Sequence, residues 1–197
     1  MYQSVRVRRV FAAAAALALL PALSLAQAPD TAAVPKVGEQ APDFSAPAST
    51  RYGLLKSPLR LSDLRGKTVV LAFFPRSRTK GCTGQMESYR DRYEKLFAGG
   101  KGIVVVSIST DADTTQQSWA RDANFPMVFV SDSSGAIGKR YGVIDEKNHY
   151  DTRVAFVLAP DGKIAYRAMP FRELTENAYA ELGTAVASTA HTGAGSN

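Results

Sequence analysis

Residues 69–85 read VVLAFFPRSRTKGCTGQ, an apolar run followed by a short polar loop and then by Cys82, the only cysteine of the 197-residue chain. The apolar run is typical of a strand buried on both faces. Three cations, Arg76, Arg78 and Lys80, lie within six residues upstream of the sulfur. A lone thiol at a strand-to-helix turn with positive charge around it is favoured as the thiolate. The sequence therefore indicates a reactive cysteine, with an inert buried side chain as the alternative.

The segments around this turn alternate between strand and helix patterns. Residues 45–60 are expected to be loop, and Ser62 is expected to cap a short turn after them. Strands are expected at residues 68–74, 103–108, 127–130, 154–158 and 163–169. Helices are expected from Cys82 to the stop at Gly99-Gly100 and at residues 112–123, 134–141 and 173–188. This order predicts an α/β fold, a central mixed β-sheet flanked by helices, with an antiparallel hairpin near its end.

The first 26 residues have the composition of a leader. They carry three arginines, then an apolar stretch, then Ser24-Leu25-Ala26, which is typical of a cleavable signal peptide. A retained N-terminal anchor is the alternative. The expected location is therefore secreted or periplasmic, with no stable membrane association after cleavage.

The rest of the chain has the composition of an ordinary globular domain. Residues 27–36 are expected to be a linker, residues 37–188 the folded domain, and residues 189–197 a disordered tail. Removal of residues 1–26 takes away three arginines and no acid, which lowers the formal charge from +6 to +3. That charge does not argue for nucleic acid as a partner. The two histidines are too few and too scattered for a metal site, and no cofactor is expected.

Six motifs follow one another in a defined order. They are Val37-Gly38-x2-Ala41-Pro42-Asp43-Phe44, Leu61-Ser62-Asp63-Leu64-Arg65-Gly66-Lys67, Pro75-x3-Thr79-x2-Cys82, Phe125-Pro126 to Ser131-Asp132, Tyr141-Gly142-Val143, and Arg153-x2-Phe156 before Pro160-Asp161-Gly162. In these motifs the chain resembles the peroxiredoxins, and most of all the branch that includes alkyl hydroperoxide reductases and bacterioferritin-comigratory proteins. The resemblance implies a thioredoxin-like fold.

In that family a cysteine attacks peroxide within a site formed by Pro, Thr, Cys and a distant Arg. Matched by position, these residues are Pro75, Thr79, Cys82 and Arg153. The resemblance implies a thiol-dependent peroxidase that reduces hydrogen peroxide or organic hydroperoxides through a Cys82 sulfenic acid. The bacterioferritin-comigratory branch often has a second cysteine where this chain has Glu87. An external reductant, a small thiol or a thioredoxin-like protein, is therefore expected to resolve the sulfenic acid.

The chemistry of peroxide reduction gives these residues separate tasks. An ordinary cysteine is a few per cent thiolate at pH 7, so complete ionisation raises the rate only about 30-fold, near 2 kcal/mol. Enzymes usually lower a barrier by at least about 8 kcal/mol. The larger share is expected from groups that hold the peroxide: the Thr79 hydroxyl, which can donate and accept, and Arg153, a permanent planar cation. Pro75, which lacks an N–H, is expected to shape the pocket.

The sequence leaves two other functions open. The first is a thioredoxin-like thiol–disulfide oxidoreductase, against which the missing C-x-x-C motif counts. The second is a non-enzymatic redox-sensing or interaction module in which Cys82 forms a mixed disulfide with a partner. Arg76, Arg78 and Lys80 are expected to form a solvated loop face. A homodimer is compatible with the sequence, which does not fix the oligomeric state.

Overall fold

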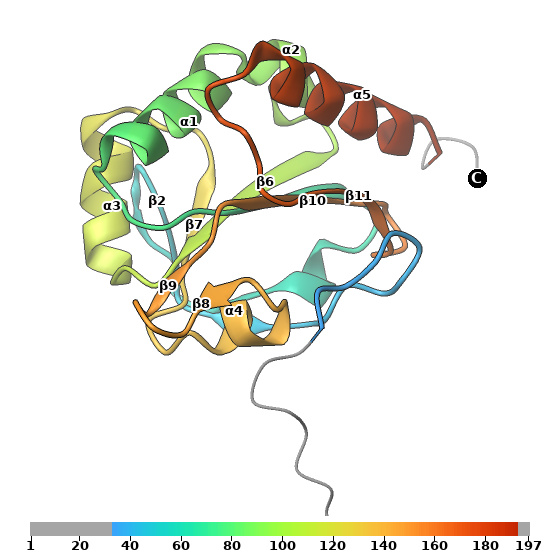
Figure 1. Ribbon diagram of the computed structural model, residues 1–197. Helices are drawn as coiled ribbons and strands as arrows, with labels where there is room; N and C mark the ends of the chain where they lie inside the picture. The colour runs from blue at the N-terminus through green and yellow to red at the C-terminus, as the bar shows by residue number, and fades with distance from the viewer. Residues whose placement is uncertain (1–32, 193–197) are drawn as a thin grey trace, which may run out of the picture.

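Strand β5 (Thr68–Phe73) lies at the centre of the fold and is buried along its whole length, as its apolar run predicts. It pairs in parallel with β6 (Ile103–Ser109) and antiparallel with β10 (Val154–Leu158). The computed structural model describes residues 33–192, and Figure 1 shows the sheet with its helices. A strand with neighbours on both edges and layers on both faces needs apolar side chains at every position, which explains the unbroken run.

The main sheet has seven strands and is mixed, so the predicted sheet is confirmed. Its order is β11 (Ile164–Ala168), β10, β5, β6, β7 (Val128–Ser131), β2 (Ala48–Thr50) and β3 (Gly53–Leu54). Two small antiparallel pairs lie outside it, formed by β1 (Ser45–Ala46) with β4 (Leu59–Arg60) and by β8 (Ile144–Asp145) with β9 (Tyr150–Asp151). The predicted loop at residues 45–60 is therefore wrong. Its strands are two or three residues long, too short to show an alternating pattern.

The helices follow the predicted order with changed bounds. They are α1 (Lys80–Asp91), α2 (Tyr93–Phe97), α3 (Asp113–Asp122), α4 (Ala136–Arg140) and α5 (Glu176–Thr192), with short 3₁₀ helices at Leu61–Leu64 and Ala98–Gly100. The single helix expected after Cys82 is divided at Arg92, whose φ of −110° and ψ of 18° leave the helical range. Ser62 does not cap the turn, because its hydroxyl and its N–H both donate to Asp43.

The C-terminal helix is longer than expected. Helix α5 continues to Thr192, so the predicted disordered tail is wrong for residues 189–192. Thr189 is buried, and its hydroxyl donates to the carbonyls of Ala185 and Val186. Packing therefore holds a small, polar segment in the helix. Residues 193–197 lie outside the described residues.

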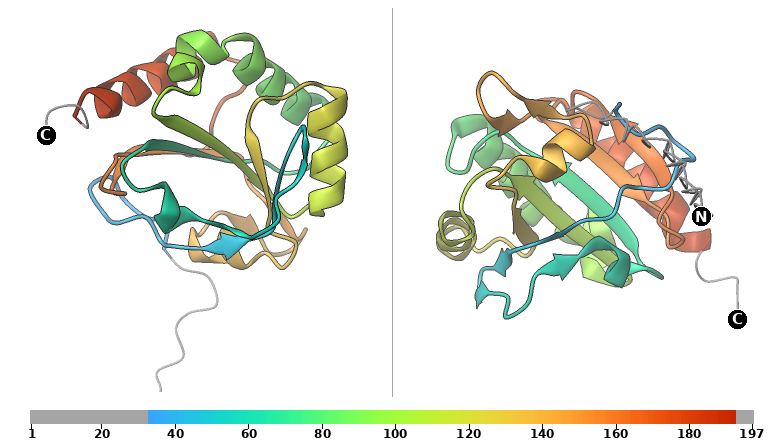
Figure 2. Two further views of the ribbon diagram at one scale, coloured as in Figure 1. Left: turned by 180° about the vertical axis from the view of Figure 1, so that it is seen from behind. Right: turned by 90° about the horizontal axis from the view of Figure 1, so that it is seen from below.

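Helices and loops cover both faces of the sheet (Figures 1 and 2), and the buried side chains form two apolar cores, one on each face. The first core contains side chains of α1, α2, α3 and α5, and the second contains side chains of α4 and of the N-terminal segment. Alternate residues of β5 serve the two cores: Val70 and Ala72 face the first, and Val69 and Leu71 face the second. Cys82 belongs to the first core.

The predicted signal peptide, residues 1–26, lies outside the described residues, as does most of the predicted linker. The described end of that linker is part of the domain. Val34 packs against the second core, and Pro35 is buried and accepts a hydrogen bond from Arg167 at 3.2 Å. The prediction of a linker is therefore wrong for residues 34–36. Within residues 33–192, no helix combines the length and apolar character needed to cross a membrane.

Candidate active site

The antiparallel pairing of β5 and β10 brings the distant arginine to the cysteine. The register places Val154 opposite Phe73, so Arg153 lies at the end of β5 where the chain leaves the sheet for α1. Cys82 is in the first turn of that helix. Nη2 of Arg153 donates to Sγ of Cys82 at 3.4 Å, across 71 positions of the chain. The structure thus brings these two site residues together.

Cys82 is held in apolar surroundings. The residue is 1% exposed and packs in the first core. A charged sulfur is disfavoured in such a place unless a cation faces it. Arg153 is that cation, and its side chain is itself only 14% exposed. The three cations of the preceding loop are exposed, as expected.

The guanidinium of Arg153 is held from three sides. Nη1 donates to Oε1 of Gln85, Nη2 faces the sulfur, and Nε lies 3.1 Å from Oε2 of Glu173. Gln85 in turn donates to the hydroxyl of Tyr89 at 3.1 Å. Burial raises the pKa of Tyr89, so this phenol stays neutral and hydrogen-bonded. The network fixes the plane and the direction of the arginine fork.

Glu173 is a site residue that the sequence does not reveal. It comes from the loop between β11 and α5, where no motif marks it. Its side chain is 19% exposed. A Cβ added to Gly81 would lie 3.0 Å from Oε1 of Glu173 and 3.1 Å from Nη2 of Arg153. The glycine before Cys82 therefore lets the ion pair lie directly against the first turn of α1.

Thr79 and Pro75 lie on the loop that joins β5 to α1. Thr79 is the N-cap residue and its carbonyl accepts from the N–H of Thr83, but its side chain does not cap the helix. The hydroxyl instead donates to the carbonyl of Arg76 at 3.0 Å. Its oxygen is therefore available as an acceptor, one of the two roles that the sequence analysis gives this hydroxyl. Pro75 is half-buried.

Two further contacts hold this loop in place. The N–H of Ser77 donates to Asp111 at 2.6 Å, and Arg78 forms an ion pair with Asp122 of α3 at 2.6 Å. Asp111 lies in the loop after β6, and Asp122 is the last residue of α3. The loop that carries Pro75 and Thr79 is thus tied to the body of the protein.

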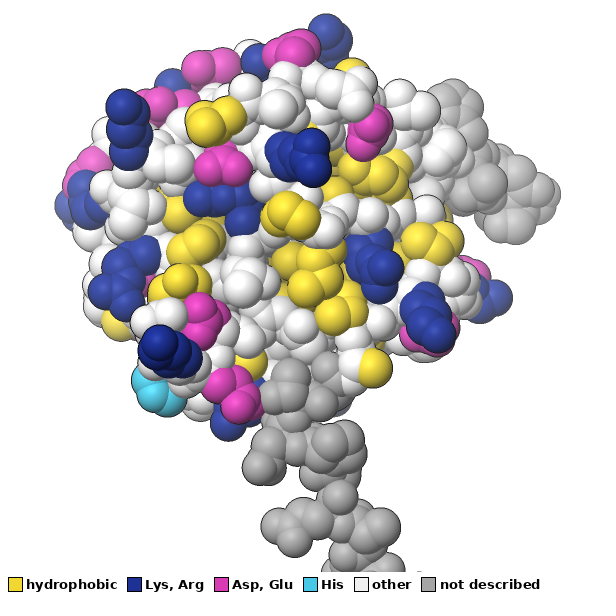
Figure 3. All heavy atoms as spheres, in the orientation of Figure 1, with side chains coloured by type: hydrophobic (Ala, Val, Ile, Leu, Met, Phe, Trp, Pro, Cys, Tyr) yellow, Lys and Arg dark blue, Asp and Glu magenta, His cyan; other side chains and the backbone are white. Residues whose placement is uncertain are grey.

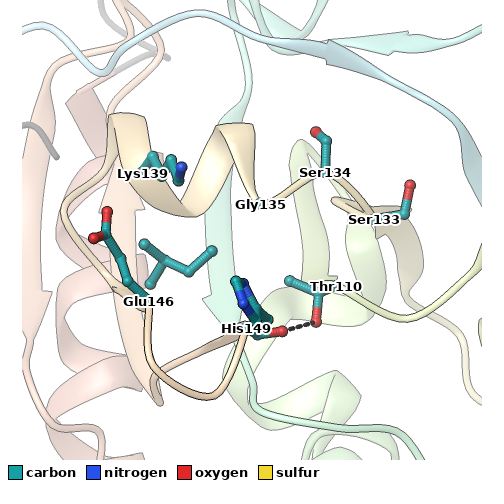
Figure 4. Close-up of a pocket in the computed structure, with 8 residues that line it drawn as sticks. Thr110, Ser133, Ser134, Gly135, Lys139, Glu146 and His149 are labelled. Carbon is teal, nitrogen blue, oxygen red and sulfur yellow. Dashed lines mark hydrogen bonds between the residues drawn. The ribbon is translucent and has the colours of Figure 1, made fainter. Parts of the chain in front are cut away.

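A separate cavity of about 420 Å³ opens elsewhere on the molecule (Figure 4). Its lining consists of Thr110, Ser133, Ser134, Gly135, Lys139, Ile144, Glu146 and His149, none of which belongs to the four-residue site. Within the described part of the chain, no group of three or more His, Cys, Asp or Glu side chains could hold a metal ion. On the face in Figure 3, basic and acidic side chains are interspersed.

A thiol at the turn between a central strand and a helix, buried and faced by a fixed guanidinium, defines a thiol peroxidase on a thioredoxin-like fold. The model of the AhpC/TSA family matches residues 37–167. A putative peroxiredoxin Bcp of Coxiella burnetii is 34% identical over 136 residues, which are 66% of this chain and 85% of that protein. Peroxiredoxin Bcp of Escherichia coli is 31% identical over 137 residues, 66% of this chain and 83% of that protein.

The fold comparison agrees. The crystal structure of peroxidoxin BcpB from Mycobacterium tuberculosis matches with a TM-score of 0.65 and 28% identity, covering 78% of this chain and 97% of that one. The chain belongs to the AhpC/TSA family, in the bacterioferritin-comigratory branch of the peroxiredoxins. It is a thiol-dependent peroxidase, an oxidoreductase that acts on peroxide. The predicted fold, family and enzyme class are confirmed.

Proposed function

We propose that the protein reduces hydrogen peroxide or organic hydroperoxides at Cys82, and that an external thiol completes the cycle. The observation that carries this proposal is the 3.4 Å contact between Nη2 of Arg153 and the buried Sγ of Cys82. A fixed cation on a buried thiol serves both the thiolate and the negative charge that moves onto oxygen during the reaction.

The oxidative step is a displacement on oxygen. The Cys82 thiolate attacks one peroxide oxygen, the S–O bond forms and the O–O bond breaks. The sulfur is oxidised to sulfenic acid, and the leaving oxygen takes a proton and departs as water or an alcohol. The three contacts of Arg153 use three of its five N–H groups within the described structure. The two others are the donors proposed for the peroxide oxygens.

Thr79 and Pro75 are proposed to complete the pocket. The Thr79 hydroxyl hydrogen is engaged by the carbonyl of Arg76, so the oxygen would accept the O–H of a bound peroxide. Arg153 would then donate to the same substrate from the other side. Pro75 has no N–H and so offers the peroxide no further donor. Thr79 and Arg153 therefore remain its two hydrogen-bond partners.

The reductive half of the cycle needs a second molecule. Cys82 is the only cysteine of the chain, so no internal thiol can condense with the sulfenic acid. An external thiol would form an S–S bond with Cys82 and release water, and a second thiol would reduce that mixed disulfide. A small thiol or a thioredoxin-like protein is the proposed reductant. The leader-like composition of residues 1–26 supports a secreted or periplasmic location for this exchange.

Peroxide consumption with dithiothreitol as reductant tests this function. The protein is expected to consume hydrogen peroxide catalytically, and Cys82→Ser is expected to remove the activity. Equal rates for the two proteins would contradict the proposal. Insulin reduction, measured in parallel, addresses the thioredoxin-like alternative, against which the missing C-x-x-C motif counts.

A further inference from the structure

We propose that Glu173 is a positioning residue for the peroxidase reaction: its carboxylate holds the guanidinium of Arg153 in the orientation that faces both Cys82 and the bound peroxide. This inference rests on the proposed function of Cys82. The carboxylate lies 3.1 Å from Nε of Arg153 and makes the third of the contacts that surround the guanidinium. It is the one of the three that comes from outside α1.

The direction of the guanidinium depends on that third contact. Gln85 and Cys82 both bind the Nη end of the fork. A fork held only at this end can still swing, because the side-chain bonds of arginine rotate freely. A carboxylate that binds Nε also fixes the opposite edge of the guanidinium, so that only one orientation of the guanidinium plane remains. Since both partners of the ion pair are more than four-fifths buried, water screens the pair less than it would at the surface.

Glu173 is itself held in place by its neighbours. Its carbonyl accepts from the hydroxyl of Tyr179 in α5 at 2.8 Å. Two residues earlier, the N–H of Phe171 donates to the carbonyl of Arg153 at 2.9 Å. Phe171 and Tyr179 both pack edge-on or tilted against Tyr89 of α1. The loop before α5 therefore contacts Arg153 through its backbone as well as through the Glu173 side chain.

The carboxylate bears differently on two reactions of Cys82. Alkylation by iodoacetamide places no developing charge on an oxygen beside Arg153, so its rate should change little when Glu173 is removed. Peroxide reduction needs Arg153 aligned with the reacting oxygens, so it should slow. A positioning role for Glu173 therefore predicts that its removal slows peroxide reduction more than alkylation of the same sulfur.

The test compares two rate constants in one set of variants of the full protein. The reaction of Cys82 with hydrogen peroxide is followed by mass spectrometry, and its reaction with iodoacetamide is measured at the same pH. The variants are Glu173→Ala, Glu173→Gln and, as a matched control, Glu176→Gln. Glu176 is the first residue of α5, three positions after Glu173, and it forms an exposed ion pair with Arg92 at 2.7 Å.

Glu173→Ala is expected to slow the peroxide reaction about tenfold and to change alkylation by less than about threefold. Glu173→Gln keeps an oxygen that can accept from Nε and should recover most of the peroxide rate. Glu176→Gln should leave both rates within about twofold of the parent, because exposed ion pairs contribute little.

A peroxide rate in Glu173→Ala within about twofold of the parent, or an equal loss of both rates, would overturn the inference. If the alanine variant does not fold, Glu173→Asp carries the same expectation, since it keeps the charge but withdraws the carboxylate by one methylene. A parent protein that fails to react with peroxide at all would instead overturn the proposed function, which separates the two failures.

Discussion

Nη2 of Arg153 lies 3.4 Å from Sγ of Cys82, although 71 positions separate the two residues. The contact follows from the antiparallel register of β5 and β10, which sets Val154 opposite Phe73. The last residue of β5, which leads into the cysteine, thus lies beside the first residue of β10, which follows the arginine. Cys82 follows β5 through a short loop and Arg153 immediately precedes β10, so the pairing of these two buried strands sets the separation of the two residues.

Replacement of Arg153 by alanine is expected to slow the reaction of Cys82 with peroxide about 10²- to 10³-fold, the usual cost of losing a donor aimed at developing charge. Alkylation by iodoacetamide should also slow, because the buried sulfur loses its cation. Stopped-flow mixing with peroxide and timed alkylation provide the two rates. Arg153→Lys keeps the charge without the fork and should retain alkylation better than peroxide reduction. A peroxide rate unchanged in Arg153→Ala would contradict the assigned role.

Gly81→Ala is expected to slow peroxide reduction about three- to tenfold, because the new methyl group would press on Glu173 and Arg153 at 3.0 and 3.1 Å. Gly84→Ala is the matched control in the same helix, since a Cβ there meets nothing within 4 Å. The control should keep its rate and gain up to about 1 kcal/mol of stability from better helix propensity. Equal activity in the two variants would show that the ion pair tolerates displacement.

Loss of the Thr79 hydroxyl is expected to remove one hydrogen bond to the bound peroxide. Thr79→Val keeps the shape of the side chain and should slow sulfenate formation about tenfold, roughly the net value of one hydrogen bond. Thr79→Ser restores the hydroxyl and should stay within about threefold of the parent. Rates that are equal in the valine and serine variants would assign Thr79 a purely structural place at the start of α1.

The buried carboxyl of Asp151 predicts a pH dependence of stability. It is fully buried, and neither oxygen has a hydrogen-bond partner within the described residues. Burial, with the charges of Asp132 and Asp111 adding to it, raises the pKa of Asp151 from 3.8 to about 8. Between these values the unfolded chain has lost a proton that the folded protein keeps. The free energy of unfolding therefore falls as pH rises from about 4 to about 8, by up to about 1.4 kcal/mol per pH unit.

Urea unfolding at pH 5 and pH 8 measures this effect. The parent should lose stability relative to Asp151→Asn on going from pH 5 to pH 8, because the amide cannot ionise. Asp145→Asn serves as the control on the same hairpin. The pKa of Asp145 is lowered by hydrogen bonds from Asn148, so this acid is ionised throughout the range in both states. Parallel pH dependence in the parent and Asp151→Asn would contradict the expectation.

The sequence predicts the centre of the site because its signals are local or lie in an ordered set of motifs. The buried strand, Pro75, Thr79 and Cys82 are contiguous, and Arg153 precedes the next central strand. Glu173 carries no such signal. Its position depends on how α5 docks through Tyr179 and Phe171, which is a matter of tertiary packing.

Other differences between sequence and structure also have physical causes. The apolar spacing of α1 continues past Arg92 into α2, so the pattern hides the break there. The small residues of the last turns of α5 suggest disorder by composition, yet alanine is the best helix former and Thr189 is buried. No sequence feature predicts the burial of Asp151, because the two-residue strand β9 that contains it is too short to show an alternating pattern.

We assign peroxide reduction to Cys82 and the resolution of its sulfenic acid to a second molecule. Mass spectrometry of the intact protein after one equivalent of hydrogen peroxide tests this assignment most directly. One added oxygen, located at Cys82 and removed by dithiothreitol, is the expected result. A protein that keeps its mass with a free thiol, while excess peroxide stays unconsumed, would contradict this assignment.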